Sequence, residues 1–130
     1  MLWLLLAGLT IAIVVTELKR LFRGYKSLVP AQLTQLINRE DALVVDLSPT
    51  GDFEKGHIAG SRNAPGSQFG PEHKLVVAAK SRPVVLVCRT GQASAAAAAK
   101  LKKAGFAQVY WLDGGVAAWQ QADLPLVKGR

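Results

Sequence analysis

The fold is decided by the stretch Pro83-Val84-Val85-Leu86-Val87-Cys88-Arg89-Thr90-Gly91-Gln92-Ala93-Ser94. Its first half is a continuous apolar run that begins at a proline, which predicts a strand buried on both faces at the centre of a covered sheet. Gly91 breaks the run, and the alanine-rich segment from Ser94 to Ala104 then predicts a helix closed by Gly105. A buried strand that turns directly into a helix is the repeating unit of an α/β sheet.

Strand and helix signals alternate on both sides of this stretch. Short apolar runs at 43–47 and 109–112 predict two further strands. Four more helices are expected: at 31–37 after Pro30, one or two turns at 49–54 before Gly56, a modest helix at 71–80, and a short one after Asp113-Gly114-Gly115. The alternation predicts one α/β domain over 28–130, a parallel sheet with helices on both faces.

The first fifteen residues have a different character, because they carry no charge and Thr10 is their only polar side chain. Apolar residues on every face are typical of a helix in lipid and argue against a buried helix of the domain. Fifteen residues reach only about 22 Å, against a hydrocarbon core of about 30 Å. The apolar residues that follow extend the contact, so we expect a short transmembrane anchor over 1–18 and a basic juxtamembrane linker over 19–27.

The distribution of charge supports this interpretation. Residues 17–26 hold four basic side chains and one acidic one, so almost half of the net charge of +7 lies in ten residues. Because no Lys or Arg precedes the apolar run, a cleavable signal peptide is disfavoured and the domain is expected in the cytoplasm, held by a single span in a bacterial inner membrane. The expected contacts are the lipid bilayer and a possible membrane protein. No basic run interleaved with aromatics follows, so no nucleic-acid partner is expected.

Cys88 is the only cysteine, so the chain has no internal disulfide. It stands at the carboxyl end of the predicted central strand, where ligands bind in open α/β sheets. The free N–H groups of the following helix, the charge of Arg89 and the loop freedom given by Gly91 all favour the thiolate anion. A reactive nucleophile and an inert buried thiol both remain open at this point. One cysteine and two distant histidines predict no metal site.

Residues 28–127 resemble the single-domain rhodanese, or thiosulfate sulfurtransferase, family along their whole length. The motifs that carry the resemblance are Asp46 at the end of the first core strand, Gly56-His57-Ile58-Ala59-Gly60-Ser61, Asn63-Ala64-Pro65, the loop from Cys88 to Ser94, Gly105-Phe106, Val109-Tyr110, Leu112-Asp113-Gly114-Gly115, Trp119 and Leu124-Pro125. Each motif is weak alone, but together in this order they are specific. The resemblance implies a mostly parallel five-stranded sheet and no cofactor.

The resemblance also implies a two-step transfer of sulfane sulfur through a persulfide on Cys88. A donor such as thiosulfate would supply the sulfur, and a thiol or cyanide would accept it. The substrate-binding loop would be Arg89, Thr90, Gly91, Gln92, Ala93 and Ser94, with backbone amides around the outer sulfur. Asp46 and His57 would support the site, by bonding backbone more than by transferring protons.

The chain departs from the family at two positions. Many relatives carry Arg where this chain has Ser48 and Ala93, so anionic donors should bind less tightly here. A phosphatase on the same fold would need Arg at position 94, where this chain has Ser94, and is excluded. A non-catalytic protein-interaction module, tethered to a membrane, remains the alternative function.

Overall fold

The structure is a computed structural model of the chain. It describes residues 1–23, 25–79 and 81–129, and the side chains of residues 16–25 lie outside that description. The element order begins with α1 (Leu2–Arg23) and then follows the strands and helices of one sheet-based domain.

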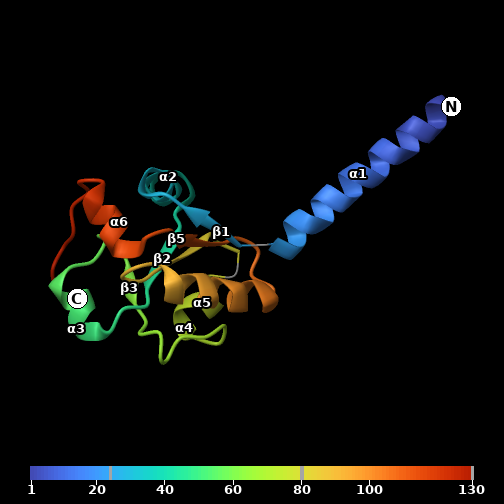
Figure 1. Cartoon of the computed structure of the whole chain (residues 1–130). Helices are drawn as coiled ribbons and strands as arrows, with labels where there is room; N and C mark the ends of the chain where they lie inside the picture. The colour runs from blue at the N-terminus through green and yellow to red at the C-terminus, as the bar shows by residue number, and fades with distance from the viewer. Residues whose placement is uncertain (24, 80, 130) are drawn as a thin grey trace.

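The centre of the domain is a sheet of five strands in the order β1-β5-β4-β2-β3. The sheet lies between helices, with α2 (Pro30–Glu40) on one side and α5 (Gln92–Lys103) on the other (Figure 1). The bounds of the strands are β1 (Tyr25–Leu28), β2 (Leu43–Asp46), β3 (Arg62–Asn63), β4 (Val84–Val87) and β5 (Val109–Leu112). Every pairing is parallel. All four residues of β4 are buried, because β4 lies in the middle of the sheet and is covered on both faces. The predicted α/β architecture with a buried central strand at 84–87 is therefore confirmed.

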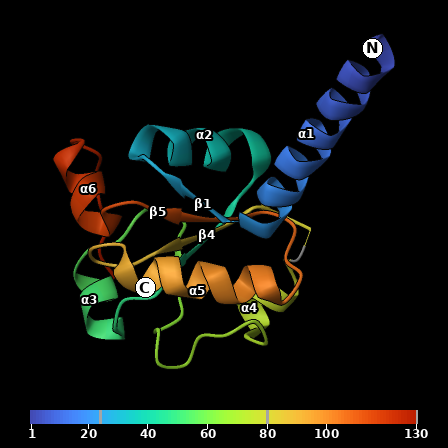
Figure 2. The same cartoon turned by 45° about the vertical axis from the view of Figure 1, so that its right-hand side comes forward.

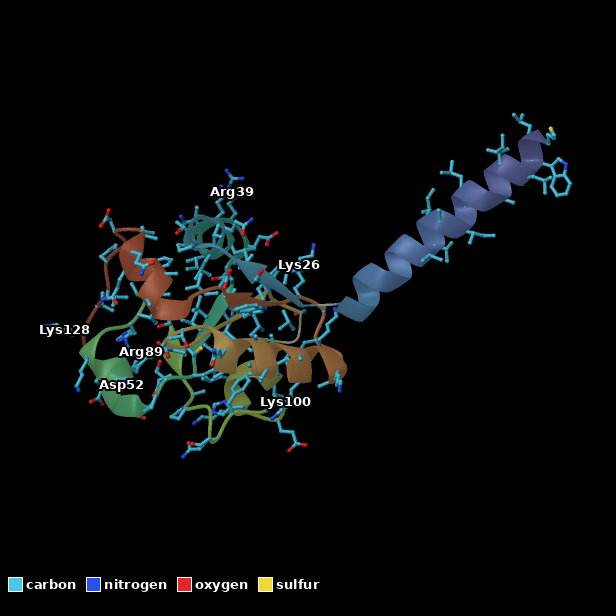
Figure 3. The ribbon with its side chains drawn as sticks, viewed as in Figure 1. Lys26, Arg39, Asp52, Arg89, Lys100 and Lys128 are labelled. Carbon is cyan, nitrogen blue, oxygen red and sulfur yellow. The ribbon has the colours of Figure 1, made fainter. Side chains whose placement is uncertain are left out.

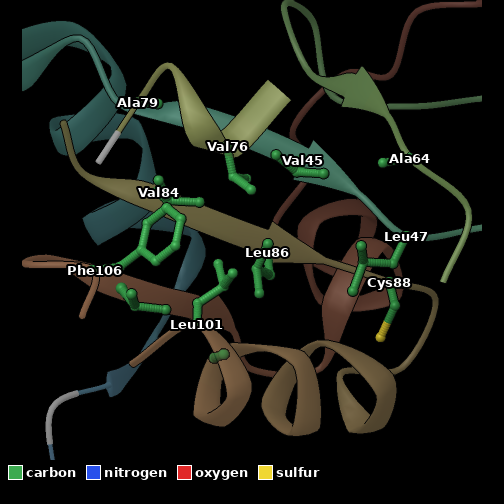
Figure 4. Close-up of a cluster of buried hydrophobic side chains, with 12 residues drawn as sticks. Val45, Leu47, Ala64, Val76, Ala79, Val84, Leu86, Cys88, Leu101 and Phe106 are labelled. Carbon is green, nitrogen blue, oxygen red and sulfur yellow. The ribbon is translucent and has the colours of Figure 1, made fainter. Parts of the chain in front are cut away.

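Helices cover both faces of the sheet. One face packs against α4 (Lys74–Val77) and α5 (Gln92–Lys103) through a cluster that includes Val76, Leu101 and Phe106 (Figure 4). The other face packs against α2 (Pro30–Glu40) and α6 (Gly115–Gln121), with Leu33 fully buried between them and the strands. Each fully buried Leu contributes about 1.5–3 kcal/mol relative to an exposed one, so the two clusters supply the main driving force for folding.

Three elements differ from the sequence prediction. The helix expected at 71–80 is only the single turn α4, which begins after His73, whose side chain accepts a hydrogen bond from the N–H of Leu75. The strands β1 and β3 were not predicted, because Tyr25–Leu28 and Arg62–Asn63 lack an apolar run. Each becomes a strand by pairing along an edge of the sheet, so its conformation depends on β5 or β2.

The N-terminal helix α1 extends away from the domain (Figure 2). Its apolar side chains up to Val15 are exposed. In the part of the chain that the structure describes, no helix has both the length and the apolar character needed to cross a membrane. The transmembrane helix expected over 1–18 is therefore not borne out by the described residues.

Strand direction fixes which ends of the strands lie near α1. The strand β1 begins two residues after α1 ends, so the two lie within about 7 Å of each other. Because all five strands are parallel, their amino ends lie toward α1 and their carboxyl ends lie at the opposite end of the sheet, which we call the carboxyl edge. The loops at the carboxyl edge, including the one that follows β4, are therefore held away from α1.

Candidate active site

Cys88 is the first residue after β4, at the carboxyl edge of the sheet. Its neighbour Leu47 follows β2 and donates its N–H to the carbonyl of Val87 at 2.7 Å, which ties the two strand ends together. The side chain of Cys88 is 6% exposed and points from the end of the core cluster toward α5 (Figure 4). The thiol therefore lies at the surface end of the core, beside the first turn of α5.

Two polar groups contact the sulfur. The backbone N–H of Gly91 donates to Sγ of Cys88 at 3.0 Å, and Oγ of Ser94 lies 3.3 Å from the same sulfur. The hydroxyl of Ser94 also donates to the carbonyl of Gly91 at 3.0 Å. Gly91 is the N-cap of α5, so the sulfur sits where the helix amides are free to bind an anion.

The backbone at Gly91 takes a conformation that favours glycine, with φ +100°. A Cβ at this position would lie 3.1 Å from the N of Gly114 and 3.3 Å from the carbonyl oxygen of Leu112. The loop is thus pressed against the end of β5, which forces its amide toward the sulfur. This is the arrangement that the sequence predicted for Gly91.

Arg89 lies at the rim of the site, half-buried. Its Nη2 donates to the carbonyl oxygen of Asp52 at 2.5 Å, on α3 (Thr50–Lys55) (Figure 3). Of the other predicted loop residues, Thr90, Gln92 and Ala93 are exposed, whereas Ser94 is buried beneath the sulfur. The structure therefore brings Cys88, Gly91 and Ser94 together and leaves the side chains of Thr90, Gln92 and Ala93 facing outward.

Asp46 is buried next to this loop and organises the turn after β2. Its Oδ1 accepts a hydrogen bond from the N–H of Ser48 at 2.8 Å. Asn63 completes the turn, since its Nδ2 donates to the carbonyls of Asp46 and Ser48 at 3.1 Å and 2.9 Å. This use of the Asn63 side chain was missed from the sequence, because it requires β3 to pair with β2.

His57 is buried beyond α3 and its contacts are with backbone and an aromatic ring. Its Nδ1 lies 2.7 Å from the carbonyl oxygen of Phe53, on whose ring it stacks at 3.7 Å. Its backbone pairs with Val127. It also borders a pocket of about 760 Å³ between α3 and β3, whose lining includes neither Cys88 nor the loop after it. His57 thus joins α3 to the C-terminal segment.

The arrangement is suited to chemistry at sulfur. A cysteine at a helix N-terminus, with an N–H aimed at Sγ, can hold negative charge on its own sulfur or on a second sulfur bound to it. Within the described residues, no group of three or more His, Cys, Asp or Glu side chains is placed to hold a metal ion. The geometry therefore supports nucleophilic attack by Cys88.

Comparisons with known proteins agree with this geometry. Residues 29–122 match the family model described as Rhodanese-like domain. The chain is 43% identical over 124 residues to the uncharacterized protein YibN of Escherichia coli K12, covering 95% of this chain and 87% of that protein. It is 36% identical over 100 residues to the thiosulfate sulfurtransferase GlpE of Shewanella oneidensis, covering 77% of this chain and 97% of that one.

The fold agrees as well. A crystal structure of a rhodanese-related protein from Thermoplasma volcanium superposes with a TM-score of 0.69 at 27% identity, covering 79% of this chain and 98% of that one. The residues that match the family model contain the strands β2 to β5, the loop from Cys88 to Ser94 and α6.

Proposed function

We propose that this chain, which belongs to the rhodanese-like domain family, is a sulfurtransferase that carries sulfur as a persulfide on Cys88. The thiolate of Cys88 attacks the outer sulfur of thiosulfate, the S–S bond of the donor breaks, and sulfite leaves with the electron pair. A thiolate or cyanide then attacks the outer sulfur of the persulfide, which yields a new persulfide or thiocyanate and returns the Cys88 thiolate. No external oxidant or reductant is needed.

The observation that carries the proposal is the hydrogen bond from the N–H of Gly91 to Sγ of Cys88, at the N-terminus of α5. An amide fixed in this position stabilises negative charge on sulfur without having to reorganise during the reaction. Thiosulfate as donor is supported by the GlpE relatives, which are named thiosulfate sulfurtransferases. Arg89 belongs to the loop and would attract the sulfite end of that donor with its guanidinium.

The alternative is a non-catalytic interaction module on the same fold. Such a module has no need of a thiol with an amide aimed at it. Cys88 is present and partnered by Gly91 and Ser94, which favours the catalytic function.

The test is to incubate the full chain with thiosulfate, remove the excess and measure its mass. We expect a gain of one sulfur atom that cyanide removes as thiocyanate, and no gain in Cys88→Ser. A second control, Val77→Cys in the Cys88→Ser background, places a thiol at an exposed position on α4, outside the loop, and should also show no gain. An unchanged mass for the native chain with thiosulfate and other sulfane donors would favour the interaction module.

We also propose that α1 holds the domain at a bacterial inner membrane, with the domain on the cytoplasmic side. The apolar side chains from Met1 to Val15 are exposed on all faces of the helix, and basic residues follow them in the sequence. Because the carboxyl edge of the sheet lies away from α1, Cys88 would then face the aqueous phase and its substrates.

Flotation of the full chain with vesicles of phosphatidylethanolamine and phosphatidylglycerol tests this placement. The chain should float with the vesicles, and Leu9→Lys, which puts a charge in the apolar part of α1, should weaken the association. Flotation that Leu9→Lys leaves unchanged, or a native chain that stays with the unbound protein, would rule out anchoring through α1.

A further inference from the structure

The loop that follows Cys88 is hydrogen-bonded to the first turn of α6. The N–H of Val116 donates to the carbonyl of Cys88 at 2.9 Å, and the N–H of Ala117 donates to the carbonyl of Arg89 at 3.2 Å. The first N–H groups of a helix have no partner within the helix. In α6 two of these free N–H groups donate instead to the carbonyls of the two peptide units that begin the catalytic loop.

These two bonds set the direction of two other amides. In a trans peptide the C=O and the following N–H point in opposite directions. Since the carbonyls of Cys88 and Arg89 point toward α6, the N–H groups of Arg89 and Thr90 point away from it. The helix α6 covers one face of the sheet and the side chain of Cys88 belongs to the cluster on the other face. The two amides are thus turned toward the side of the sulfur.

The same two amides are available to a ligand. Across residues 25–79 and 81–129, neither the N–H of Arg89 nor that of Thr90 donates to a protein acceptor. Together with the N–H of Gly91, which already reaches Sγ, they form a row of three donors beside the sulfur. A row of successive amides of this kind binds anions.

Gly115 is the residue that allows α6 to approach so closely. A Cβ at this position would lie 2.1 Å from the carbonyl oxygen of Cys88 and 2.7 Å from the carbonyl group of Arg89. The backbone of Gly115 also has φ +59°. Any side chain here would push the catalytic loop away from α6 and rotate both peptide units.

We propose that Gly115 is a positioning residue for sulfur transfer: by letting the first turn of α6 bind the carbonyls of Cys88 and Arg89, it aims the amides of Arg89 and Thr90 at the outer sulfur of the persulfide and at its donor. This inference deepens the proposed function and rests on it. On this proposal α6 helps to form the anion-binding site through its backbone, although none of its side chains contacts the sulfur.

The experiment compares Gly115→Ala with Gly105→Ala in the full chain. Gly105 has φ +95°, so alanine is strained there as well, but no atom lies within 4 Å of the added Cβ. Both variants should have a lower melting temperature than the native chain. Two further readouts, which strain alone does not move, are the pH midpoint of Cys88 alkylation by iodoacetamide and the single-turnover rate of sulfur uptake from thiosulfate.

Gly115→Ala should raise the alkylation midpoint by about one pH unit and slow sulfur uptake about tenfold, which corresponds to the loss of roughly one hydrogen bond to a charged group. Gly105→Ala should match the native chain in both readouts. A folded Gly115→Ala variant with the native midpoint and native rate would overturn the inference.

A second variant covers the case in which Gly115→Ala does not fold. Ala117→Pro, at an exposed position in the first turn of α6, removes the N–H that binds the carbonyl of Arg89 and puts the proline Cδ in its place against that carbonyl. It should shift the alkylation midpoint in the same direction, and an unchanged midpoint would count against the inference. Alkylation needs no sulfur donor, so a native chain that takes up no sulfur while these shifts persist would refute the proposed function alone.

Discussion

Removing the hydroxyl of Ser94 is the sharpest test of how the sulfur is stabilised. Ser94 is fully buried, and its Oγ lies 3.3 Å from Sγ of Cys88 while it donates to the carbonyl of Gly91 at 3.0 Å. A hydroxyl has a single proton, so it can donate to only one of these acceptors at a time. When Cys88 is a thiolate or a persulfide anion, we expect the proton to turn from the carbonyl to the sulfur.

The size of the effect of Ser94→Ala follows from this switch. A hydrogen bond to a charged group is worth about 1.5–3 kcal/mol, which corresponds to a loss of about 10- to 150-fold in the rate of persulfide formation. The bond to the Gly91 carbonyl is a neutral one, so the free energy of unfolding should fall by only about 1 kcal/mol. The slowing of persulfide formation should therefore be larger than expected from the small loss of folding stability alone.

Ser61→Ala is the matched control. Ser61 is also buried, and its Oγ donates to the carbonyl of Ile58, three residues earlier, at 2.7 Å, as Ser94 does to Gly91. Urea denaturation should show a similar loss of stability for both variants, whereas rapid mixing with thiosulfate and mass measurement should show slow sulfur uptake only for Ser94→Ala. Equal rates in the two variants would refute a role of the hydroxyl at the sulfur.

Three further predictions follow from other contacts. Arg89→Gln should raise the thiosulfate concentration needed for half-maximal uptake about tenfold, because a charge-assisted contact is lost. Arg82→Gln is the control, since Arg82 binds a backbone carbonyl at the opposite end of the sheet, and it should leave that concentration unchanged. Leu33→Ala should lower the free energy of unfolding by about 2–5 kcal/mol in urea denaturation, because it empties a fully buried site between α2 and the sheet; a loss below about 1 kcal/mol would contradict that packing. Burial and, to a smaller extent, the charge of Glu40 raise the pKa of Tyr110 above its ordinary value of 10.0. As the pH rises, the unfolded chain therefore loses the Tyr110 proton before the folded chain does. The urea midpoint of unfolding should be constant below about pH 10 and fall above it, less steeply in Glu40→Gln. An equal fall in the two proteins would contradict the contribution of Glu40.

Local pattern was sufficient to predict the central part of the fold. The run from Val84 to Val87 predicted a strand covered on both faces, because every side chain in it is apolar and the pleat sends successive side chains to opposite faces. Gly91 and the alanine-rich stretch after it then required a turn into a helix, and α5 begins at Gln92. Cys88 was thereby placed at the carboxyl end of a strand, where its sulfur meets free helix amides.

The edge strands and the helix α1 show where local pattern is insufficient. Tyr25–Leu28 reads as a basic, irregular segment, and it is a strand only because β5 offers it a line of backbone partners. The apolar run at the N-terminus predicted a transmembrane helix from composition, but among the described residues no helix combines the length and the apolar character of a membrane span.

The sequence by itself thus determined the alternation of the three central strands with helices, the burial of β4 and the position of Cys88 after it, because burial and backbone freedom depend on neighbouring residues. Only the tertiary structure decided what surrounds the sulfur. The guanidinium of Arg89 reaches the carbonyl of Asp52, and α6 binds the carbonyl of Cys88, across separations of 37 and 28 residues. Such contacts are set by how the strands pair and which helix covers which face, and no local pattern of residues encodes that geometry.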